Sequence, residues 1–192
     1  MKNLETRTDN EIVAIALNDA DVFAVLVQRY EKKLFRYIFR ISGFCRETIE
    51  DLLQEIFIKV YQNLNDFNDQ FSFSSWIYRI THNVTVSHLR DGKKDMNVLS
   101  IEDEDSAKSL IELLPADVDL PKEFDRKNLS KELQKALMKI PDKYREVLVL
   151  FYIEGKSYKE ISDILKRSIN SVSVLINRAK MKLKPELEFL NR

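Results

Sequence analysis

A chain of 192 residues, 44% of them apolar, is long and apolar enough for one or two packed domains, and its three Gly and four Pro argue against a turn-rich β fold. The net charge of zero hides an asymmetry: residues 1–92 carry 11 Lys/Arg and 13 Asp/Glu (net −2), residues 93–121 carry 3 and 8 (net −5), and residues 122–192 carry 17 and 10 (net +7). The basic last third indicates a polyanionic partner for that part of the chain.

The first part of the chain predicts three helices, because apolar residues recur every three or four positions. Thr8 and Glu11 have the spacing of a capping box that opens the first helix. A second helix is expected over about residues 21–42, and Gly43 is a natural residue to end it. A third helix is expected over about residues 46–64. Its broad apolar stripe consists of Ile49, Leu52, Leu53, Ile56, Phe57, Val60, Tyr61 and Leu64.

A polar and aromatic loop over residues 65–73 separates the third helix from a fourth. Ser74 or Ser75 is suited to cap this fourth helix, which is expected over residues 76–90. The single tryptophan and several of the phenylalanines in this region are expected to be core residues, which leaves the polar loop residues as candidates for binding.

Periodicity fades over residues 93–121, which are acidic and contain Pro115 and Pro121, so we interpret them as a linker between domains. Helical patterns resume over about residues 123–138 and 144–153. The sequence therefore predicts an all-α fold of two helical domains, residues 1–92 and 122–192, joined by an acidic linker.

The end of the second domain has the pattern of a helix-turn-helix. Ser157 and Glu160 form a second capping box before a short helix, and Lys166 and Arg167 form the tight turn. Ser168 is suited to cap a last, basic helix. A plain pair of antiparallel helices is the alternative explanation of this pattern alone.

The residues needed for several other function classes are missing or badly spaced. Cys45 is the single cysteine, which suits a reducing cytoplasm, and His82 and His88 lie on different faces of a helix, so no metal site is expected. There is no glycine-rich phosphate loop and no catalytic Cys arrangement, so we expect neither an enzyme nor a cofactor. No apolar run approaches ~20 residues and no signal peptide is evident, so we expect a cytoplasmic protein without stable membrane insertion.

Three segments, in this order along the chain, resemble the extracytoplasmic-function (ECF) sigma factors, members of the sigma-70 superfamily. Residues 51–61 resemble the family's polymerase-binding helix, and residues 73–90 resemble the segment that melts and reads the -10 promoter element. Residues 141–161 resemble the start of the domain that reads the -35 element. The resemblance covers about residues 8–92 and 122–184. It implies that core RNA polymerase, promoter DNA and an anti-sigma factor are the partners.

The resemblance also assigns candidate residues to each task. The helix face that would bind core polymerase carries Asp51, Gln54 and Glu55. Residues for the -10 element are Asn68, Asp69, Gln70, Ser72, Arg79, Asn83 and Arg90. Residues for the -35 element are Ser168, Asn170, Ser171, Ser173, Asn177, Arg178 and Lys182. A pocket in the polar loop would offset the few kcal/mol of stacking that an extruded base loses.

The helix-turn-helix departs from the family pattern at three positions. Lys166 stands where the family usually has Gly in the turn, while Ser173 and Leu175 stand where basic residues are common. The main alternative function is a conventional operator-binding regulator with a helix-turn-helix, and a helical adaptor that binds only proteins is a further one. Co-purification with core polymerase separates these alternatives, because only a sigma factor requires it.

Overall fold

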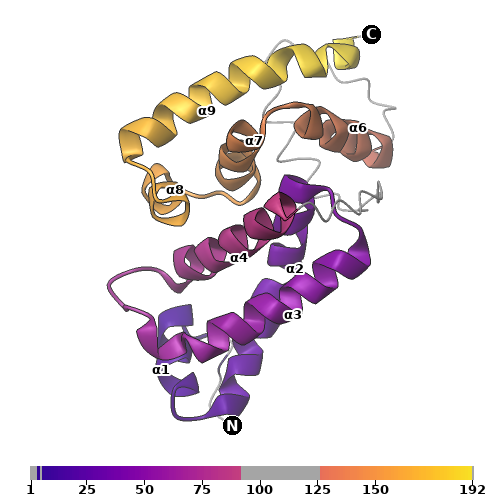
Figure 1. The fold of residues 1–192 in the computed structure, drawn as a ribbon. Helices are drawn as coiled ribbons and strands as arrows, with labels where there is room; N and C mark the ends of the chain where they lie inside the picture. Colours follow the sequence, from indigo (N-terminus) through magenta and orange to yellow (C-terminus); the bar gives the residue numbers. More distant parts are fainter. Residues whose placement is uncertain (1–3, 5, 92–125, 192) are drawn as a thin grey trace.

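The computed structural model describes residue 4 and residues 6–91 and 126–191, the last range without the side chains of residues 126–129 and 188–191 (Figure 1). The described residues form helices and loops, which confirms the all-α prediction. The predicted acidic linker over residues 93–121 and the predicted helix start near residue 123 lie outside the described residues.

Over its described residues, the first helical unit contains four α-helices and two short 3-10 turns. These are α1 (Asp9–Ala16), η1 (Ala20–Val22), α2 (Phe23–Ser42), α3 (Arg46–Gln62), η2 (Leu64–Asp66) and α4 (Phe73–Arg90). The second unit contains α6 (Arg126–Lys139), α7 (Asp142–Leu148), the π-helical η3 (Val149–Ile153), α8 (Tyr158–Leu165), α9 (Ile169–Leu183) and η4 (Lys184–Asn191).

Local signals in the sequence set most helix ends. Both predicted capping boxes form, at the start of α1 and of α8, and Gly43 ends α2 with a φ of 71°. The predicted cap of α4 was wrong: Ser72 caps the helix, because its hydroxyl oxygen accepts a hydrogen bond from the Ser75 backbone N–H at 3.1 Å. Ser75 is buried in the helix, and Ser74 faces the second unit.

The structure confirms that aromatic residues before and within α4 belong to the core. Phe73 and Trp76 are buried, and their rings pack on each other and on Phe67. The predicted stripe of α3 was too wide, because Tyr61 is 46% exposed although the edge of its ring contacts Phe23.

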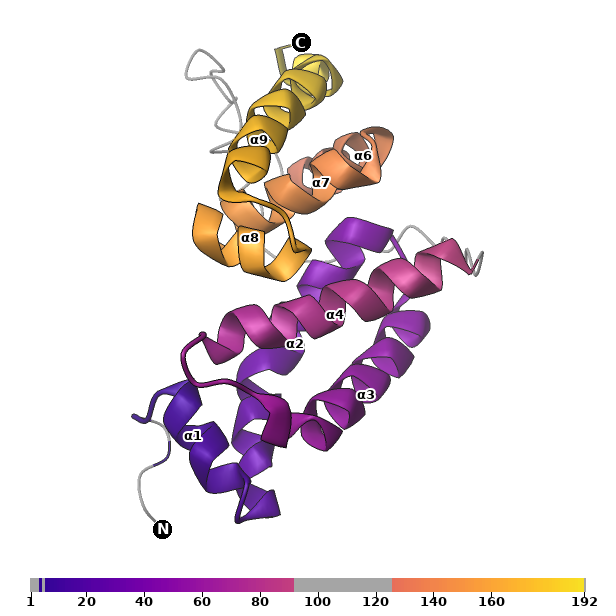
Figure 2. The same cartoon turned by 60° about the vertical axis from the view of Figure 1, so that its left-hand side comes forward.

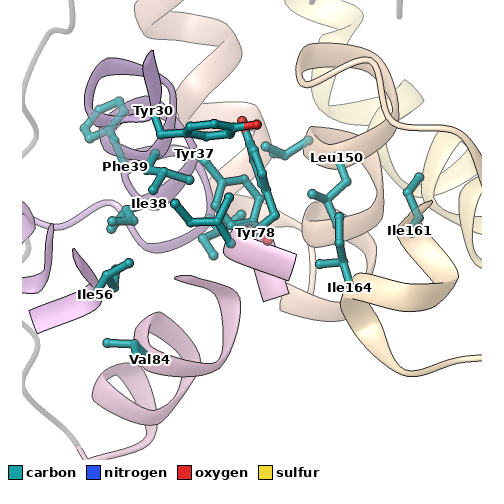
Figure 3. Packing of buried hydrophobic residues seen from close by; sticks show 14 of the residues in the cluster. Tyr30, Tyr37, Ile38, Phe39, Ile56, Tyr78, Val84, Leu150, Ile161 and Ile164 are labelled. Carbon is teal, nitrogen blue, oxygen red and sulfur yellow. The ribbon is translucent and has the colours of Figure 1, made fainter. Parts of the chain in front are cut away.

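The two units pack against each other mainly through α4 and α8, which lie side by side in both views (Figures 1 and 2). The buried apolar residues form one cluster that continues across this contact. Figure 3 shows Tyr78 of α4 facing Leu150, Ile161 and Ile164 of the second unit. The second unit therefore covers one side of α4.

A polar seam runs through this contact. One row of α4, with residues four apart, supplies Ser74, Tyr78 and His82, and the second unit supplies Lys156, Glu154 and Glu146. The Lys156 ammonium donates to the Ser74 hydroxyl at 2.6 Å, and the Tyr78 hydroxyl donates to the Glu154 carboxylate. Nε2 of His82 lies 4.0 Å from a carboxylate oxygen of Glu146.

His82 is neutral in the seam. Its burial, with a smaller contribution from the charge of Arg167, lowers the pKa of its imidazole to about 4. Tyr37 lies 3.0 Å from Nδ1, and burial raises the pKa of this phenol well above its ordinary value. The phenol therefore keeps its proton and is able to donate a hydrogen bond to Nδ1; in that arrangement the imidazole hydrogen is on Nε2, on the side of Glu146.

The pKa of Glu146 is shifted in the opposite direction, upward. Burial, and to a lesser extent the charge of Asp142, raise the pKa of its carboxyl to about 7 against the opposing charges of Arg145 and Arg167. Because the carboxyl pKa is raised in the folded protein, Glu146 contributes stability that is fully present below pH 4.5, the ordinary pKa of the group. This stability is lost as the pH rises through 7. The lowered pKa of His82 contributes stability above 6.5, and this stability is lost as pH falls toward 4.

Between pH 5 and pH 7, the contributions of His82 and Glu146 to stability therefore change with pH in opposite directions. Relative to the wild type, His82→Gln should therefore gain stability when the pH falls from 7 to 5, whereas Glu146→Gln should lose stability. Each change should be about 1–2 kcal/mol, from pKa differences of this size. Urea unfolding of the three proteins at both pH values measures the effect, and slopes of the same sign in the two variants would contradict the assignment.

Candidate nucleic-acid interface

The polar face of α3 is the first candidate surface. Asp51, Gln54 and Glu55 are exposed as expected, because Leu52, Leu53 and Ile56 turn the other side of the helix into the core. The exposed row also contains an apolar residue that the sequence reasoning missed. Ile58 is 57% exposed, and its spacing from Asp51 and Gln54 places it on the same side.

A groove of about 630 Å³ lies between α3 and α4. It brings together residues predicted for two different tasks, with Glu55 on the α3 side and Arg79 and Asn83 on the α4 side. Lys59, which also lines the groove, is paired with Glu55 at 2.6 Å. The α4 wall can offer a guanidinium to a phosphate and an amide that both donates and accepts, which suits a nucleic-acid strand.

The loop before α4 is held by a residue from the start of the chain. The Asn10 amide nitrogen donates to the backbone carbonyls of Asp69 and Phe71, at 3.2 and 3.1 Å, and its oxygen accepts from the Phe73 N–H at 3.1 Å. Sequence reasoning missed Asn10, because its partners lie some 60 residues away and no local pattern marks it. The loop is therefore fixed from outside as well as by its own turn.

Two of the predicted loop residues have structural tasks of their own. The Asn68 side chain accepts from the Gln70 backbone N–H at 3.0 Å, and the Ser72 hydroxyl caps α4. Asp69 and Gln70 are exposed. Arg90 is exposed at the far end of α4 and is not among the residues that line the groove.

A smaller space of about 130 Å³ lies between this loop and the turn after α8. Asn68 and Arg79 line it from the first unit, and Asp163 and Lys166 line it from the second. Arg79 thus borders both spaces. No local pattern in the sequence predicts that Asp163 and Lys166 lie beside the loop.

The exposed side of α9 carries most of the residues predicted for duplex DNA. Exposed positions are Ser168, Asn170, Asn177, Arg178 and Lys182, whereas Ser171 and Ser173 are partly buried. The Ser168 hydroxyl caps the helix by accepting from the Ser171 N–H. The helix contains no Asp or Glu, and it exposes Ile169 and Val174 to about half of their surface.

Two of the unusual residues in the helix-turn-helix now have physical explanations. Leu175 is buried against the core, so this position of α9 does not face outward. Lys166 adopts a φ of 52°, a left-handed conformation that costs a residue with a Cβ roughly 1–2 kcal/mol. Two hydrogen bonds between Ser162 and Arg167, at 2.5 and 3.1 Å, hold this turn.

The described part of the chain contains no group of three or more His, Cys, Asp and Glu residues that could hold a metal ion. Over the same residues, no helix has the length and apolar character that crossing a bilayer requires.

Comparisons with known proteins bear on these surfaces. The family description Sigma-70 region 2 matches residues 26–95, and Sigma-70, region 4 matches residues 130–183. The ECF RNA polymerase sigma factor SigW of Bacillus subtilis is 32% identical over 97% of this chain and 100% of its own length. The ECF RNA polymerase sigma-E factor of Haemophilus influenzae is 28% identical over 96% of this chain and 97% of its own.

Two solved structures share the fold. CnrH, solved in complex with the cytosolic domain of CnrY, has a TM-score of 0.69 and 24% identity, over 94% of this chain and 97% of that one. The sigma factor RpoE, solved with the anti-sigma factor NepR from Bartonella quintana, has a TM-score of 0.64 and 19% identity, over 86% of this chain and 96% of that one.

Asn10→Ala should loosen the loop before α4. Two carbonyls and one N–H lose their partner, so the free energy of unfolding should fall by about 1–2 kcal/mol and the Phe73 amide should exchange faster. Asn18→Ala is the matched control, because the Asn18 amide makes one long bond of 3.4 Å to the Ala14 carbonyl. Equal protection of the Phe73 amide in the wild type and Asn10→Ala would show that the loop is held by other contacts.

Proposed function

Because this chain belongs to the ECF group of sigma-70 RNA polymerase sigma factors, we propose that three of its surfaces divide the steps of transcription initiation. The α3 face binds core RNA polymerase, the groove between α3 and α4 with its adjoining loop binds the opened -10 element, and α9 reads the -35 element. The sigma factor family is non-catalytic, and we propose that this chain likewise acts by binding alone, in the cytoplasm where RNA polymerase works.

The observation that carries the proposal is the exposed row on α3. A polar row interrupted by one exposed aliphatic residue suits a partner helix, since Ile58 gains from burial while Asp51 and Gln54 form directional bonds. The fold of α3 does not need these side chains, because its core contacts are made by the opposite side of the helix. They are therefore available for a partner.

The groove and loop suit strand opening for a different reason. An extruded base needs a preformed pocket, and Asn10 and the Asn68 turn fix the loop before any DNA binds. Arg79 lies between loop and groove, where it can hold a phosphate, and Asn83 lines the groove further along α4. We propose that the strand follows this path.

For α9, the exposed side combines cations with apolar groups. Arg178 is suited to a guanine edge or a phosphate, and Lys182 to a phosphate. Exposed Ile169 and Val174 can contact thymine methyl groups. The start of the helix at Ser168 adds an N-terminal dipole for a further phosphate.

An anti-sigma factor is the remaining expected partner. RpoE of Bartonella quintana was solved with the anti-sigma factor NepR, and CnrH was solved with the cytosolic domain of CnrY. We propose that this chain is also bound by a protein of this class.

Gln54→Ala combined with Glu55→Ala should weaken polymerase binding while leaving the fold intact. Each substitution of an exposed side chain should change the free energy of unfolding by no more than about 0.5 kcal/mol. Association with core polymerase should weaken by about 2 kcal/mol or more, because groups desolvated against a partner become hot spots. Fluorescence anisotropy with labelled protein measures the affinity.

The matched control is Glu31→Ala combined with Lys32→Ala, an exposed pair on α2. It should bind core polymerase as the wild type does. Wild-type affinity in a folded Gln54/Glu55 variant would reject the α3 face, and no affinity in the wild type itself would reject the proposed function.

Arg178→Ala should weaken binding to the -35 element by about 1–3 kcal/mol with loss of selectivity if the contact is to a base edge. Lys182→Ala should weaken binding to all sequences alike and reduce the salt slope by about 1, as loss of one phosphate contact does. Titrations of matched and scrambled duplexes at several salt concentrations distinguish the two. Lys131→Ala on α6 is the control, and unchanged binding in Arg178→Ala would exclude this residue from the interface.

A further inference from the structure

The loop before α4, over residues 68–72, is exposed but held by hydrogen bonds. All five of its residues are exposed, so burial of side chains does not fix its conformation. Its backbone is fixed instead: the Phe71 N–H donates to the Asn68 carbonyl at 3.1 Å, and the Asn10 amide donates to the carbonyls of Asp69 and Phe71. Ordering the backbone of one residue costs about 1–2 kcal/mol. A loop that is already ordered does not incur this cost when a ligand binds.

Asn10 is held in place through its neighbour Asp9. One oxygen of the Asp9 carboxylate accepts from the Arg29 guanidinium at 2.7 Å, and the other accepts from the Tyr30 hydroxyl. Burial, together with the hydrogen bond to Asp9, raises the pKa of the Tyr30 phenol above its ordinary value, so this hydroxyl keeps its proton and donates. The same guanidinium donates to two backbone carbonyls of the segment before α1, at 2.9 and 3.0 Å. The start of α1 is therefore fastened to α2.

These contacts form a closed circuit between α1, α2 and the end of the loop, which lies beside α1 in Figure 2. The Tyr30 ring packs edge-on against the Phe73 ring, with 5.6 Å between the ring centres, and both residues are buried. The Phe73 N–H donates to the Asn10 side-chain oxygen at 3.1 Å. We call the four residues of this circuit, Asp9, Asn10, Tyr30 and Phe73, the brace.

The brace lies apart from the surfaces that we assign to DNA. Over the described chain, none of its four residues lines the groove or the smaller space beside the loop. The start of α1 also precedes residues 26–95, which match Sigma-70 region 2. The loop that the brace holds nevertheless carries Asn68, Asp69 and Gln70, which we assign to the opened strand. The brace can therefore act on the strand only through the loop.

We propose that the brace sets the loop in its strand-binding conformation before DNA arrives, which makes Asp9, Asn10 and Tyr30 positioning residues for capture of the opened -10 strand. This inference rests on the proposed function. Loss of the brace leaves the loop to be ordered at the moment of binding, so capture of the strand weakens. The α3 face and α9 do not depend on the loop, so their binding is unchanged.

The test compares three affinities of each variant. A promoter fragment with a premelted -10 element and 2-aminopurine in the opened strand reports strand capture by its fluorescence, with the sigma factor bound to core polymerase. A duplex that contains the -35 element and core polymerase itself report the other two surfaces. Asp9→Ala and Asn10→Ala should each weaken strand capture about tenfold, the effect of losing about two hydrogen bonds, and should change the other affinities less than about twofold.

The double variant shows whether the brace acts as a unit. If Asp9 acts through Asn10, the protein with both Asp9→Ala and Asn10→Ala should capture the premelted strand about tenfold more weakly than the wild type, as each single variant does. Independent contributions would instead multiply to a loss of about a hundredfold. A loss of that size would overturn the brace.

Ser42→Ala is the matched control for lost stability. Ser42 is buried at the opposite end of α2, where its hydroxyl donates to the Ile38 carbonyl and accepts from the Phe44 N–H. The substitution should lower the free energy of unfolding as the brace variants do, yet leave strand capture unchanged. Equal loss of capture in Ser42→Ala, or an equal fall of all three affinities in the brace variants, would show lost stability and reject the positioning role.

Tyr30→Phe keeps the proposal testable if the alanine variants fail to fold. It retains the ring that packs on Phe73 and removes only the hydroxyl bond to Asp9, so strand capture should weaken about threefold. Unchanged capture in this variant would mean that the brace is wrong while the proposed function stands. If the wild-type protein with core polymerase binds the premelted fragment no more tightly than its duplex form, the proposed function fails and the brace fails with it.

Discussion

The packing of α4 is the constraint on which the rest of this structure depends. Its apolar row, which includes Phe73 and Ile77, is buried against the first unit, and this fixes the rotation of the helix. With 3.6 residues per turn, the remaining rows are then fixed as well, one toward the groove and one toward the second unit. A single buried face thus orients both Arg79 and Tyr78, and it links the proposed DNA path to the contact between the units.

The charged residues fall into two physically different groups. Those on α3 and α9 are exposed, so they keep their hydration until a partner replaces it, and they contribute little to the stability of the free chain. Those in the seam are already removed from water, which is why the pKa of His82 is lowered and that of Glu146 is raised. The first group suits binding to external partners, and the second suits a defined docking geometry within the chain.

The sequence by itself determined the features that depend on nearby residues. Helices and their caps follow from side-chain spacing and from hydrogen bonds that reach three or four residues, as at Thr8 and Ser157. It also indicated that Asp51, Gln54 and Glu55 are exposed, because the opposite row is apolar. The misplaced cap of α4 and the exposed Tyr61 show the limit of this reasoning, since several serines can cap and an aromatic ring can pack by its edge alone.

Only the tertiary structure decided which distant residues meet. Asn10 holds a loop about 60 positions away, and Glu154 accepts from Tyr78 across 76 positions. Periodicity identifies the buried side of a helix but not the neighbour that covers it, and a polar row such as Ser74, Tyr78 and His82 has the same pattern whether it faces water or protein. The groove and the seam therefore depend on how complete helices pack, and that packing is set by the summed burial of many side chains rather than by any local signal.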